Sequence, residues 1–342
     1  MGKAMTKTKK RTIASLITLA VTLAFYFAAS SLIYAGAIDS YTVTLINIVC
    51  VNVVAAVSLN MVTGLMGQLV LGHAGFMLIG AYTSAIFVNT MGGNLYVSFP
   101  ISLLLGGLFA GGIGLVIGIP ALRLRGDYLA IITLGFGEII RVIANNLKIT
   151  GGAFGYSGYP AFSSRTQPNG LFNFVFIIMV FIIFFSYTFG TSRHGRAVIA
   201  IREDEIAAES SGINTTYYKL LTFTLSACFA GIAGGLLSQY VGVIGAEKFN
   251  FNYSIEILMM VVLGGMGSIT GSVAAAVVLT ILPQLLLNFS DYRMLLYSII
   301  LILVMLFRPT GLLGRKEIQV IPLFEKLTGK NKAKTPAKEA KK

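Results

Sequence analysis

Charged residues are scarce in this sequence, and their scarcity decides its class. Only 11% of the 342 residues are charged, whereas 56% are hydrophobic and the mean hydropathy is +0.81. Soluble domains carry roughly a quarter charged residues, so this chain cannot coat a water-soluble surface. Apolar runs near the ~20 residues that cross a bilayer recur throughout. Because these runs are long and continuous, they disfavour an outer-membrane barrel and predict an all-α polytopic membrane protein.

Cysteine and histidine are too few to build a framework. Cys50 and Cys228 are the only cysteines, and both lie in predicted spans, so we expect free buried thiols and no disulfide. His73 has no second His, Cys or acid at metal-ligand spacing, so no metal site is expected. The first apolar run, 12–34, follows a basic cluster, but it is too long for a cleaved signal sequence and is interpreted as an uncleaved span.

Catalytic and nucleotide-binding motifs are also missing. The sequence has no H-E-x-x-H, no G-x-x-x-x-G-K-[ST], and no G-x-S-x-G elbow matched to a usable histidine. We therefore expect neither enzymatic activity nor a cofactor in this chain. Energy for any uphill process must come from another subunit or from an ion gradient.

The net charge of +13 is distributed as membrane topology requires, because Lys and Arg gather at both ends and in two internal loops. This placement argues against a nucleic-acid partner. It predicts about ten transmembrane helices with both termini in the cytoplasm. The predicted spans are 12–34, 43–62, 69–89, 98–121, 127–146, 171–189, 217–243, 254–264, 268–288 and 291–307.

Glycine interrupts two of the apolar regions. "GLMGQLVLGHAGFMLIGAYTSA" (64–85) holds five glycines together with Gln68 and His73, and the short span 254–264 runs into "GGMGSITG". Irregular backbone at membrane depth must line protein or water, so such segments point to a transport site. The stretches 67–75 and 264–272 are interpreted as paired breaks of an inverted internal repeat. The candidate residues of a translocation path here are Gln68, Gly72, His73, Gly265 and Gly267.

A third glycine pattern lies in the predicted span 98–121. Gly107, Gly111, Gly114 and Gly118 share one helix face, which predicts either static close packing or a sliding interface against a neighbouring helix.

Glu138 and Arg141 are ionisable residues inside the predicted span 127–146. At about 1.5 Å per residue, Glu138 lies about 16 Å beyond Asp127, near mid-bilayer if Asp127 marks the cytoplasmic edge. Arg141 follows three positions later on the same face and can pair with Glu138. A charge at that depth is costly. Both residues are therefore candidates for the translocation path, and the alternative is a purely structural ion pair.

The longest cytoplasmic connection, residues 190–216, contains "GRAVIAIREDEIAAESSGIN". Residues 198–211 are predicted to form one helix, with Gly212 as its C-terminal stop. Its charged block is followed by a surface of small residues. We expect this helix to insert into a cleft of a peripheral protein, and the alternative is a solvated connecting helix.

At this loop the sequence resembles the M-type permease subunit of branched-chain amino-acid ABC importers. The loop is similar to the coupling segment of that family, and three other stretches agree, at 64–85, 122–146 and 264–277. The resemblance covers roughly residues 40–312. It implies a transmembrane permease domain over 12–312, flanked by basic cytoplasmic segments 1–11 and 313–342, in a bacterial or archaeal cytoplasmic (inner) membrane.

The resemblance also implies partners. Two ABC ATPase subunits would power transport, a sister permease would share the path, and a periplasmic or lipid-anchored substrate-binding protein would deliver the amino acid. One residue departs from the importer consensus, because Ile206 stands where a glutamate is usual, and Glu205 or Glu209 would supply that charge. The residues expected to couple to the ATPase are Arg196, Arg202, Glu203, Asp204, Glu205, Ala207, Ala208 and Gly212.

The outer loop 148–170 is rich in Gly, Tyr and Phe, and it predicts either a docking site for the binding protein or a plain Ω-loop.

Two other functions stay open. The same architecture could import urea, short amides or another small solute. A secondary transporter using Glu138 as its ion site would instead work alone and fail with an uncoupler.

Overall fold

The computed structural model describes residues 22–124, 126–162, 170–286 and 292–308, with Gly311 and Gly314. The chain divides into two units, residues 1–31 with 318–342 and residues 32–317. Of the predicted first span, residues 22–34 are helical and 12–21 lie outside the described residues. Everything below concerns the larger unit.

Helices are the regular secondary structure of the described part of the larger unit, and one isolated bridge joins Tyr156 and Ile244. Its long helices are α2 (Ser40–Asn60), α3 (His73–Met91), α4 (Leu95–Ala121), α5 (Asp127–Asn146), α6 (Gly170–Thr191), α9 (Thr215–Val241), α10 (Phe251–Gly264), α11 (Ile269–Leu285) and α12 (Arg293–Phe307). Two shorter helices, α7 (Arg193–Glu203) and α8 (Glu205–Ser210), lie between α6 and α9. A π-helical turn, η1 (Met61–Met66), continues α2, and 3-10 turns η2 (Lys148–Thr150), η3 (Gly152–Phe154) and η4 (Ala246–Phe249) lie in the loops.

Every predicted span from 43–62 onward overlaps one of these helices, but α3 begins at His73, so residues 69–72 of the predicted span 69–89 are not helical. Five stretches of the described chain are long and apolar enough to cross a membrane: Ser40–Met66, His73–Met91, Leu95–Ala121, Gly170–Thr191 and Thr215–Val241. An all-α polytopic membrane protein is therefore confirmed. The number of crossings, the side of the termini and the internal repeat stay predictions.

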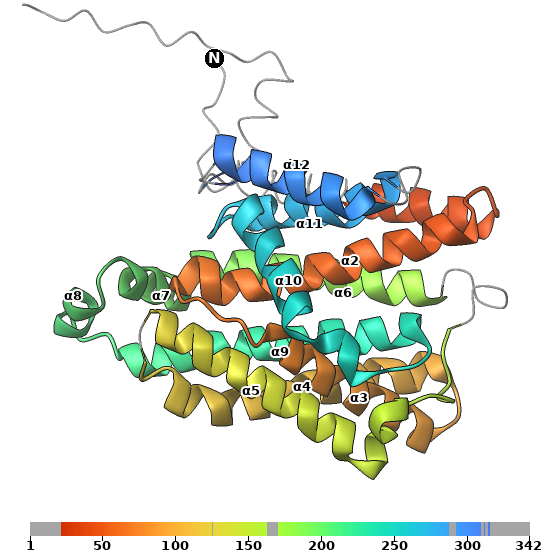
Figure 1. Ribbon diagram of the computed structural model, residues 1–342, viewed down its shortest axis with the longest axis horizontal. Helices are drawn as coiled ribbons and strands as arrows, with labels where there is room; N and C mark the ends of the chain where they lie inside the picture. Colours follow the sequence, from red (N-terminus) through yellow and green to blue (C-terminus); the bar gives the residue numbers. More distant parts are fainter. Residues whose placement is uncertain are drawn as a thin grey trace, which may run out of the picture. The chain divides into compact units, whose positions relative to one another are not determined.

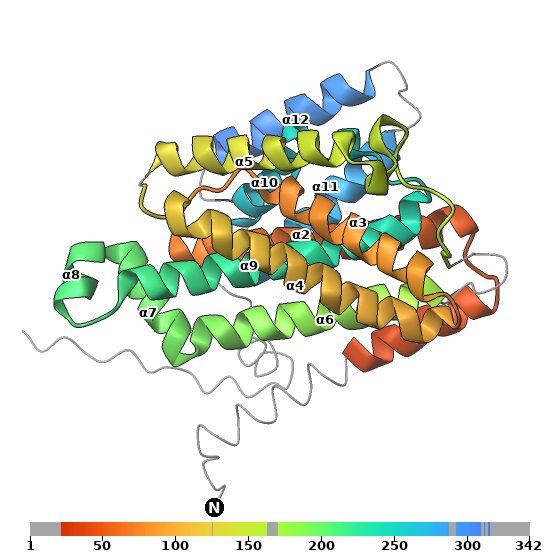
Figure 2. The same ribbon diagram turned by 90° about the horizontal axis from the view of Figure 1, so that it is seen from below.

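Most of the long helices lie side by side, whereas α10 runs across them in Figure 1, and α7 and α8 project beyond their ends on one side (Figures 1 and 2). Helix α9 is central, because it packs against both α3 and α4, and α2 packs against α6, α9 and α11. The buried core runs between these helices, with Met77, Phe223 and Leu236 among its largest fully buried side chains.

Small residues bring α3, α4 and α9 into backbone contact. A Cβ atom at Gly80 would lie 1.9 Å from the Gly231 carbonyl oxygen, and one at Gly111 would lie 2.1 Å from the Cys228 sulfur. The predicted glycine face of α4 therefore packs on α9, where only hydrogen fits. This contact is the close packing that the sequence predicts, and whether the helices slide along it stays open.

The two ends of the bundle carry different segments. At one end Arg123 lines a cavity with Glu205 and Lys219, next to α8. At the other end Tyr156 pairs with Ile244, beyond the end of α9. The described residues near Arg123 and Glu205, predicted to be cytoplasmic, thus lie at the α8 end, and those near Tyr156 and Ile244, predicted to be external, lie at the opposite end.

Candidate functional site

Helices α3 and α10 both follow irregular backbone, and their first turns meet. Residues 67–72 lead from η1 into α3, and residues 242–250 lead from α9 into α10. The Ala74 backbone N–H donates to the Ser254 hydroxyl over 3.1 Å, which joins the two helix starts. Within 242–250, Ile244 and Phe249 are buried, so this segment enters the bundle. Irregular backbone packed in this way is typical of transport sites at membrane depth.

A narrow cleft lies where these two helix starts meet α5. Its lining is mainly apolar, with one carboxylate: Leu71, Gly75, Leu134, Gly137, Glu138, Phe249, Asn250, Phe251 and Ser254. Gly72 holds α3 against α5, because a Cβ atom there would lie 2.1 Å from the Thr133 carbonyl oxygen. The Thr133 hydroxyl in turn accepts a hydrogen bond from the Leu71 N–H over 3.1 Å. The wall of the cleft is thus set by backbone contact.

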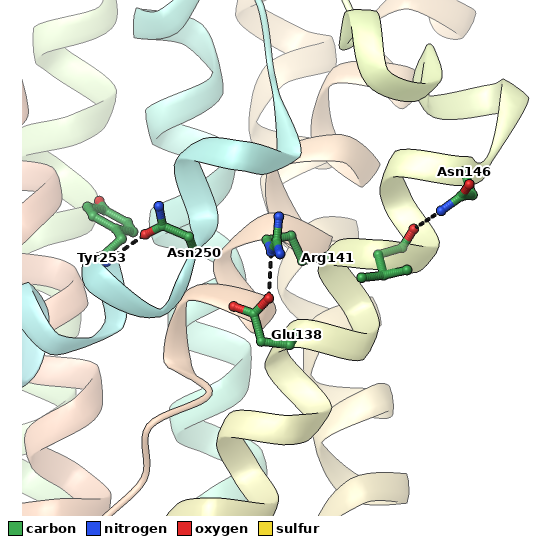
Figure 3. Close-up of polar contacts among 6 residues, drawn as sticks. Glu138, Arg141, Asn146, Asn250 and Tyr253 are labelled. Carbon is green, nitrogen blue, oxygen red and sulfur yellow. Dashed lines mark hydrogen bonds and ion pairs between the residues drawn. The ribbon is translucent and has the colours of Figure 1, made fainter.

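Glu138 and Arg141 form the predicted ion pair on α5. The Arg141 Nε donates to Glu138 Oε2 over 2.7 Å, and the side chains are 27% and 33% exposed for Arg141 and Glu138. Figure 3 shows the pair beside the segment that carries Asn250 and Tyr253 at the start of α10. The Asn250 side chain caps that helix by accepting from the Tyr253 N–H. The pairing is confirmed, and its role in transport stays a prediction.

The other path candidates lie away from the cleft. His73 is buried behind it, where its Nε2 lies 2.8 Å from the Ser58 hydroxyl. The Ser226 hydroxyl donates to the Ser58 carbonyl over 2.7 Å, so this group joins α2, α3 and α9. Gln68 is half-buried just beyond η1, and its side-chain Oε1 has no hydrogen-bond partner in the described part of the chain.

Gly267 lies at a junction of the two predicted breaks, at the α8 end of the bundle. The Asn60 side chain accepts from the Gly267 N–H over 2.9 Å and donates to the Ser268 carbonyl over 3.2 Å. The same Asn60 oxygen lies 1.9 Å from where a Cβ atom of Gly64 would be. Only glycine fits at position 64. Gly265, which ends α10 with a φ of +106°, is buried beside this junction.

The coupling segment is two helices, and the prediction of one helix over 198–211 is wrong. Helix α7 begins earlier, at Arg193, and stops at Asp204, whose backbone is extended with a φ of −155°. The Asp204 carboxylate accepts from the N–H groups of Ile206 and Ala207 at 2.9 and 3.0 Å, and so caps α8. A side chain that caps a new helix competes with continuation of the old one. The predicted stop at Gly212 is confirmed, with a φ of +84°.

The coupling residues divide between solvent and the bundle. Ile206 is 70% exposed, and Ala207 and Gly212 are exposed, whereas Ala208 is buried. Glu205 turns inward and pairs with Lys219 of α9 over 2.7 Å. This pair and the end of α4 line one cavity of about 270 Å³. Arg196 is exposed and bonds the Thr191 carbonyl, Glu203 is exposed, and Arg202 turns inward to Gly64.

The described part of the outer loop, 148–162, is anchored at several points. Tyr156 and Tyr159 stack on each other, the Tyr156 hydroxyl accepts from Asn89, and the Tyr159 hydroxyl donates to the Ser238 carbonyl. Burial raises the pKa of Tyr159 to about 12. By contrast, Phe154 is 96% exposed. Residues 163–169 of the predicted loop lie outside the described residues.

Residues 41–307 match a protein family described as the permease component of branched-chain amino acid transport systems. The chain belongs to this family. Relatives in the permease family extend the match over most of its length. LivM of Salmonella typhimurium, a high-affinity branched-chain amino acid transport system permease protein, is 38% identical over 309 residues, or 81% of this chain and 70% of that protein.

Two further relatives separate the permease types. LivM of Escherichia coli strain K12 is 38% identical over 337 residues, 89% of this chain and 75% of that protein. LivH of the same strain is 39% identical over only 132 residues, 38% of this chain and 42% of that protein. The M-type resemblance therefore covers more than twice as much of the chain. No solved structure gives a significant match.

Sequence reasoning overlooked three residues that build this permease's site region. Asn60 joins the two breaks, Ser58 holds His73, and Lys219 pairs with Glu205. Asn60 carried a usable signal, because it is a polar residue in an apolar span, four positions before a glycine. Lys219 carried a signal as well, because it is a charged residue inside the predicted span 217–243. Ser58 carried none. No group of three or more metal-ligating side chains occurs among the described residues.

Proposed function

We propose that this chain is a membrane-spanning permease subunit of an ATP-driven importer for branched-chain amino acids. The observation that carries the proposal is the family match over 41–307, together with the LivM resemblance over most of the chain. Those relatives are described as branched-chain amino acid permeases. The apolar helices and the projecting coupling segment suit the same role. Because the chain has no nucleotide-binding motif, ATP hydrolysis belongs to partner subunits.

The translocation path passes the cleft between α3, α5 and α10. A branched-chain amino acid has an ammonium group, a carboxylate and an aliphatic side chain. Glu138 suits the ammonium, Arg141 suits the carboxylate, and apolar residues such as Leu71 and Leu134 suit the side chain. The cleft in this chain is too narrow for a whole amino acid, so a sister permease supplies the opposite wall. The LivH resemblance supports a paired arrangement.

Helix α8 docks into a cytoplasmic ATPase subunit. Its exposed surface carries Ile206, Ala207, Glu209 and Ser210, which offer one apolar contact among small side chains. Glu205 faces Lys219, so Glu209 is left to supply an acidic contact. The cavity beneath α8 leaves this helix room to move against α4 and α9.

The remaining partners follow from the two ends of the bundle. A substrate-binding protein docks on loop 148–162, where Ile149 and Phe154 present exposed apolar side chains on a well-anchored loop. Two ATPase subunits bind at the α8 end, one for each permease. The assembly lies in the cytoplasmic membrane, with α8 on the cytoplasmic side.

Reconstitution tests this function. Proteoliposomes are built with this chain, its sister permease, two ATPase subunits and the binding protein of the same cell. We expect uptake of radiolabelled leucine that requires ATP and stops when any component is omitted. Uptake of urea without leucine would contradict the substrate. Uptake by this chain alone, abolished by an uncoupler, would contradict the class and favour an ion-coupled transporter.

A further inference from the structure

Arg202 ends close to the membrane helices and away from solvent. It is the penultimate residue of α7, and its Nη1 donates to the Gly64 carbonyl over 2.8 Å. Its aliphatic stem lies on Gly67, where a Cβ atom would be 2.4 Å from the Arg202 Cγ. The side chain is 19% exposed, and Glu203 beside it balances the charge over 2.6 Å. Arg202 is therefore poorly placed to reach a protein docked on α8.

The carbonyl that Arg202 binds belongs to the π-helical turn η1. A π turn interrupts the regular α-helical ladder, and such turns are frequent at functional sites. Gly67 ends this turn with a φ of +74°, a conformation that favours glycine. The two glycines let the guanidinium and its stem lie directly on the backbone.

The same position gives Arg202 access to the second break. A Cβ atom at Gly267 would lie 3.3 Å from the Arg202 Nη1, and Asn60 ties Gly267 to the end of α2. One guanidinium therefore lies against both breaks at once. It comes from the segment that carries α8, while the breaks belong to the membrane helices.

Both breaks lead directly to the cleft. Residues 67–72 run from η1 to the start of α3, and α10 runs from the cleft to Gly265, two residues before Gly267. The ends of two cleft-lining elements thus meet at the residue that α7 presents. A displacement of α7 would move both ends together.

We propose that Arg202 is a positioning residue that transmits movement of α7 and α8 to the cleft, by holding the two helix breaks against the coupling segment. This inference rests on the proposed function and adds the physical link between the ATPase end and the path. The guanidinium acts on backbone carbonyl and glycine surfaces, and it touches neither the amino acid nor the ATPase.

The test uses the reconstituted complex and counts leucine molecules imported per ATP hydrolysed. Arg202→Gln should lower this ratio by about tenfold, within the range of usual coupling energies, while the complex still assembles and hydrolyses ATP. Arg202→Lys keeps the charge but loses the planar guanidinium, so its import ratio should lie between those of the wild type and Arg202→Gln. Arg193→Gln is the matched control, because Arg193 is exposed on the same helix, and its ratio should equal that of the wild type.

Amide exchange supplies a second measurement that a purely structural role would not change. In the wild type, nucleotide binding should alter exchange both in α8 and in residues 65–68. In Arg202→Gln only α8 should respond. A wild-type import ratio in Arg202→Gln, or a preserved response at 65–68, would overturn the proposal.

Two further outcomes are decided in advance. If Arg202→Gln fails to assemble, Arg202→Lys decides, and a wild-type ratio with a wild-type exchange response would overturn the inference. A wild-type complex without ATP-driven uptake would refute the proposed function itself, which is a different result from a working complex that ignores Arg202.

Discussion

Glu138 and Arg141 neutralise each other within one turn of α5, yet about a third of each side chain is exposed. The pair joins two positions of the same helix, so it does not by itself bind α5 to a neighbouring helix. Partial exposure beside a cleft leaves both groups able to exchange partners. For a zwitterionic amino acid the exchange is balanced, because one new contact forms for each half of the pair.

Removing the charges singly and together separates packing from transport. Glu138→Gln leaves Arg141 unpaired, so we expect poorer assembly and lower uptake. Glu138→Gln combined with Arg141→Gln removes the unpaired charge and should restore assembly, measured by co-purification of the sister permease. The leucine uptake rate of the double variant should stay at least about tenfold below that of the wild type, which corresponds to about 1.4 kcal/mol of free energy. Recovery of uptake together with assembly would show that the pair is structural.

Tyr159 gives the outer loop a pH limit. Its pKa is about 12 in the folded protein, above the usual 10.0, because the hydroxyl is buried. Below pH 10 the hydroxyl is neutral in folded and unfolded chains, and its hydrogen bond to Ser238 stabilises the loop. Between pH 10 and 12 only the unfolded chain ionises, so stability falls by at most about 1.4 kcal/mol per pH unit.

Thermal melting of the detergent-solubilised chain from pH 8 to 12 measures this effect. Tyr159→Phe should be less stable at pH 8, because the hydrogen bond is lost, and it should show a shallower decline above pH 10. Parallel curves for the two proteins would contradict the assignment.

At the scale of elements, the start of α8 depends on one capping side chain, Asp204. Helix α8 has only six residues, and Asp204 satisfies two of its first N–H groups. So short a helix has little stability of its own. Asp204→Ala should therefore cost about 0.5–2 kcal/mol locally and loosen α8 from its docking orientation.

Uncoupling is the expected result of Asp204→Ala, with ATP hydrolysis continuing while leucine uptake falls several-fold. Asp204→Asn and Asp204→Ser also cap helices, so both should retain coupling if the cap is what matters. A loss that is equal in all three variants would point to the charge at position 204, as would be expected of a direct contact with the ATPase.

The division between α7 and α8 also shows what sequence patterns can predict. The apolar helices follow from hydropathy, which is a local property, and the stop at Gly212 follows from a glycine that adopts positive φ. The local sequence around Asp204 is compatible with two structures, a continuous helix or a new helix that Asp204 caps. The pattern alone therefore does not predict the break between α7 and α8. The Glu138–Arg141 pair was predictable, since i,i+3 spacing places the two on one face.

Contacts between distant residues could not be predicted in this way. Ala74 bonds Ser254, Asn60 bonds Gly267, and Arg202 bonds Gly64. No periodicity relates such positions, because each bond depends on how whole helices pack. The sequence did mark both breaks by their glycines, but their meeting, and the irregular segment before α10, required the structure.

The outer loop is the second element with a testable surface. Phe154→Ser should leave the fold intact, since the side chain is almost fully exposed, and should weaken binding-protein affinity by about tenfold. Ile206→Ser, at the opposite end, is the crossed control. It should lower ATPase stimulation without changing that affinity. Surface plasmon resonance on nanodisc complexes measures the affinity, and unchanged binding in Phe154→Ser would place the dock elsewhere.

For the whole molecule, the two ends of the bundle carry different candidate docking surfaces. One end carries α7 and α8, which would contact an ATPase subunit, and the other carries loop 148–162 with exposed apolar side chains. The cleft lies between the two ends and connects to the α8 end through the two glycine breaks. This polarity has meaning only if the ends lie on opposite sides of one membrane.

Cysteine labelling tests that polarity directly. In a chain with Cys50 and Cys228 replaced by Ala, we introduce Phe154→Cys or Ser210→Cys, both at exposed positions. A membrane-impermeant maleimide added to intact cells, with their outer layers made permeable if necessary, should label position 154 at once. Position 210 should react only after the cytoplasmic membrane is opened. Labelling of position 210 from outside would invert the orientation. Labelling of positions 154 and 210 from outside would mean that the chain between them crosses the membrane an even number of times.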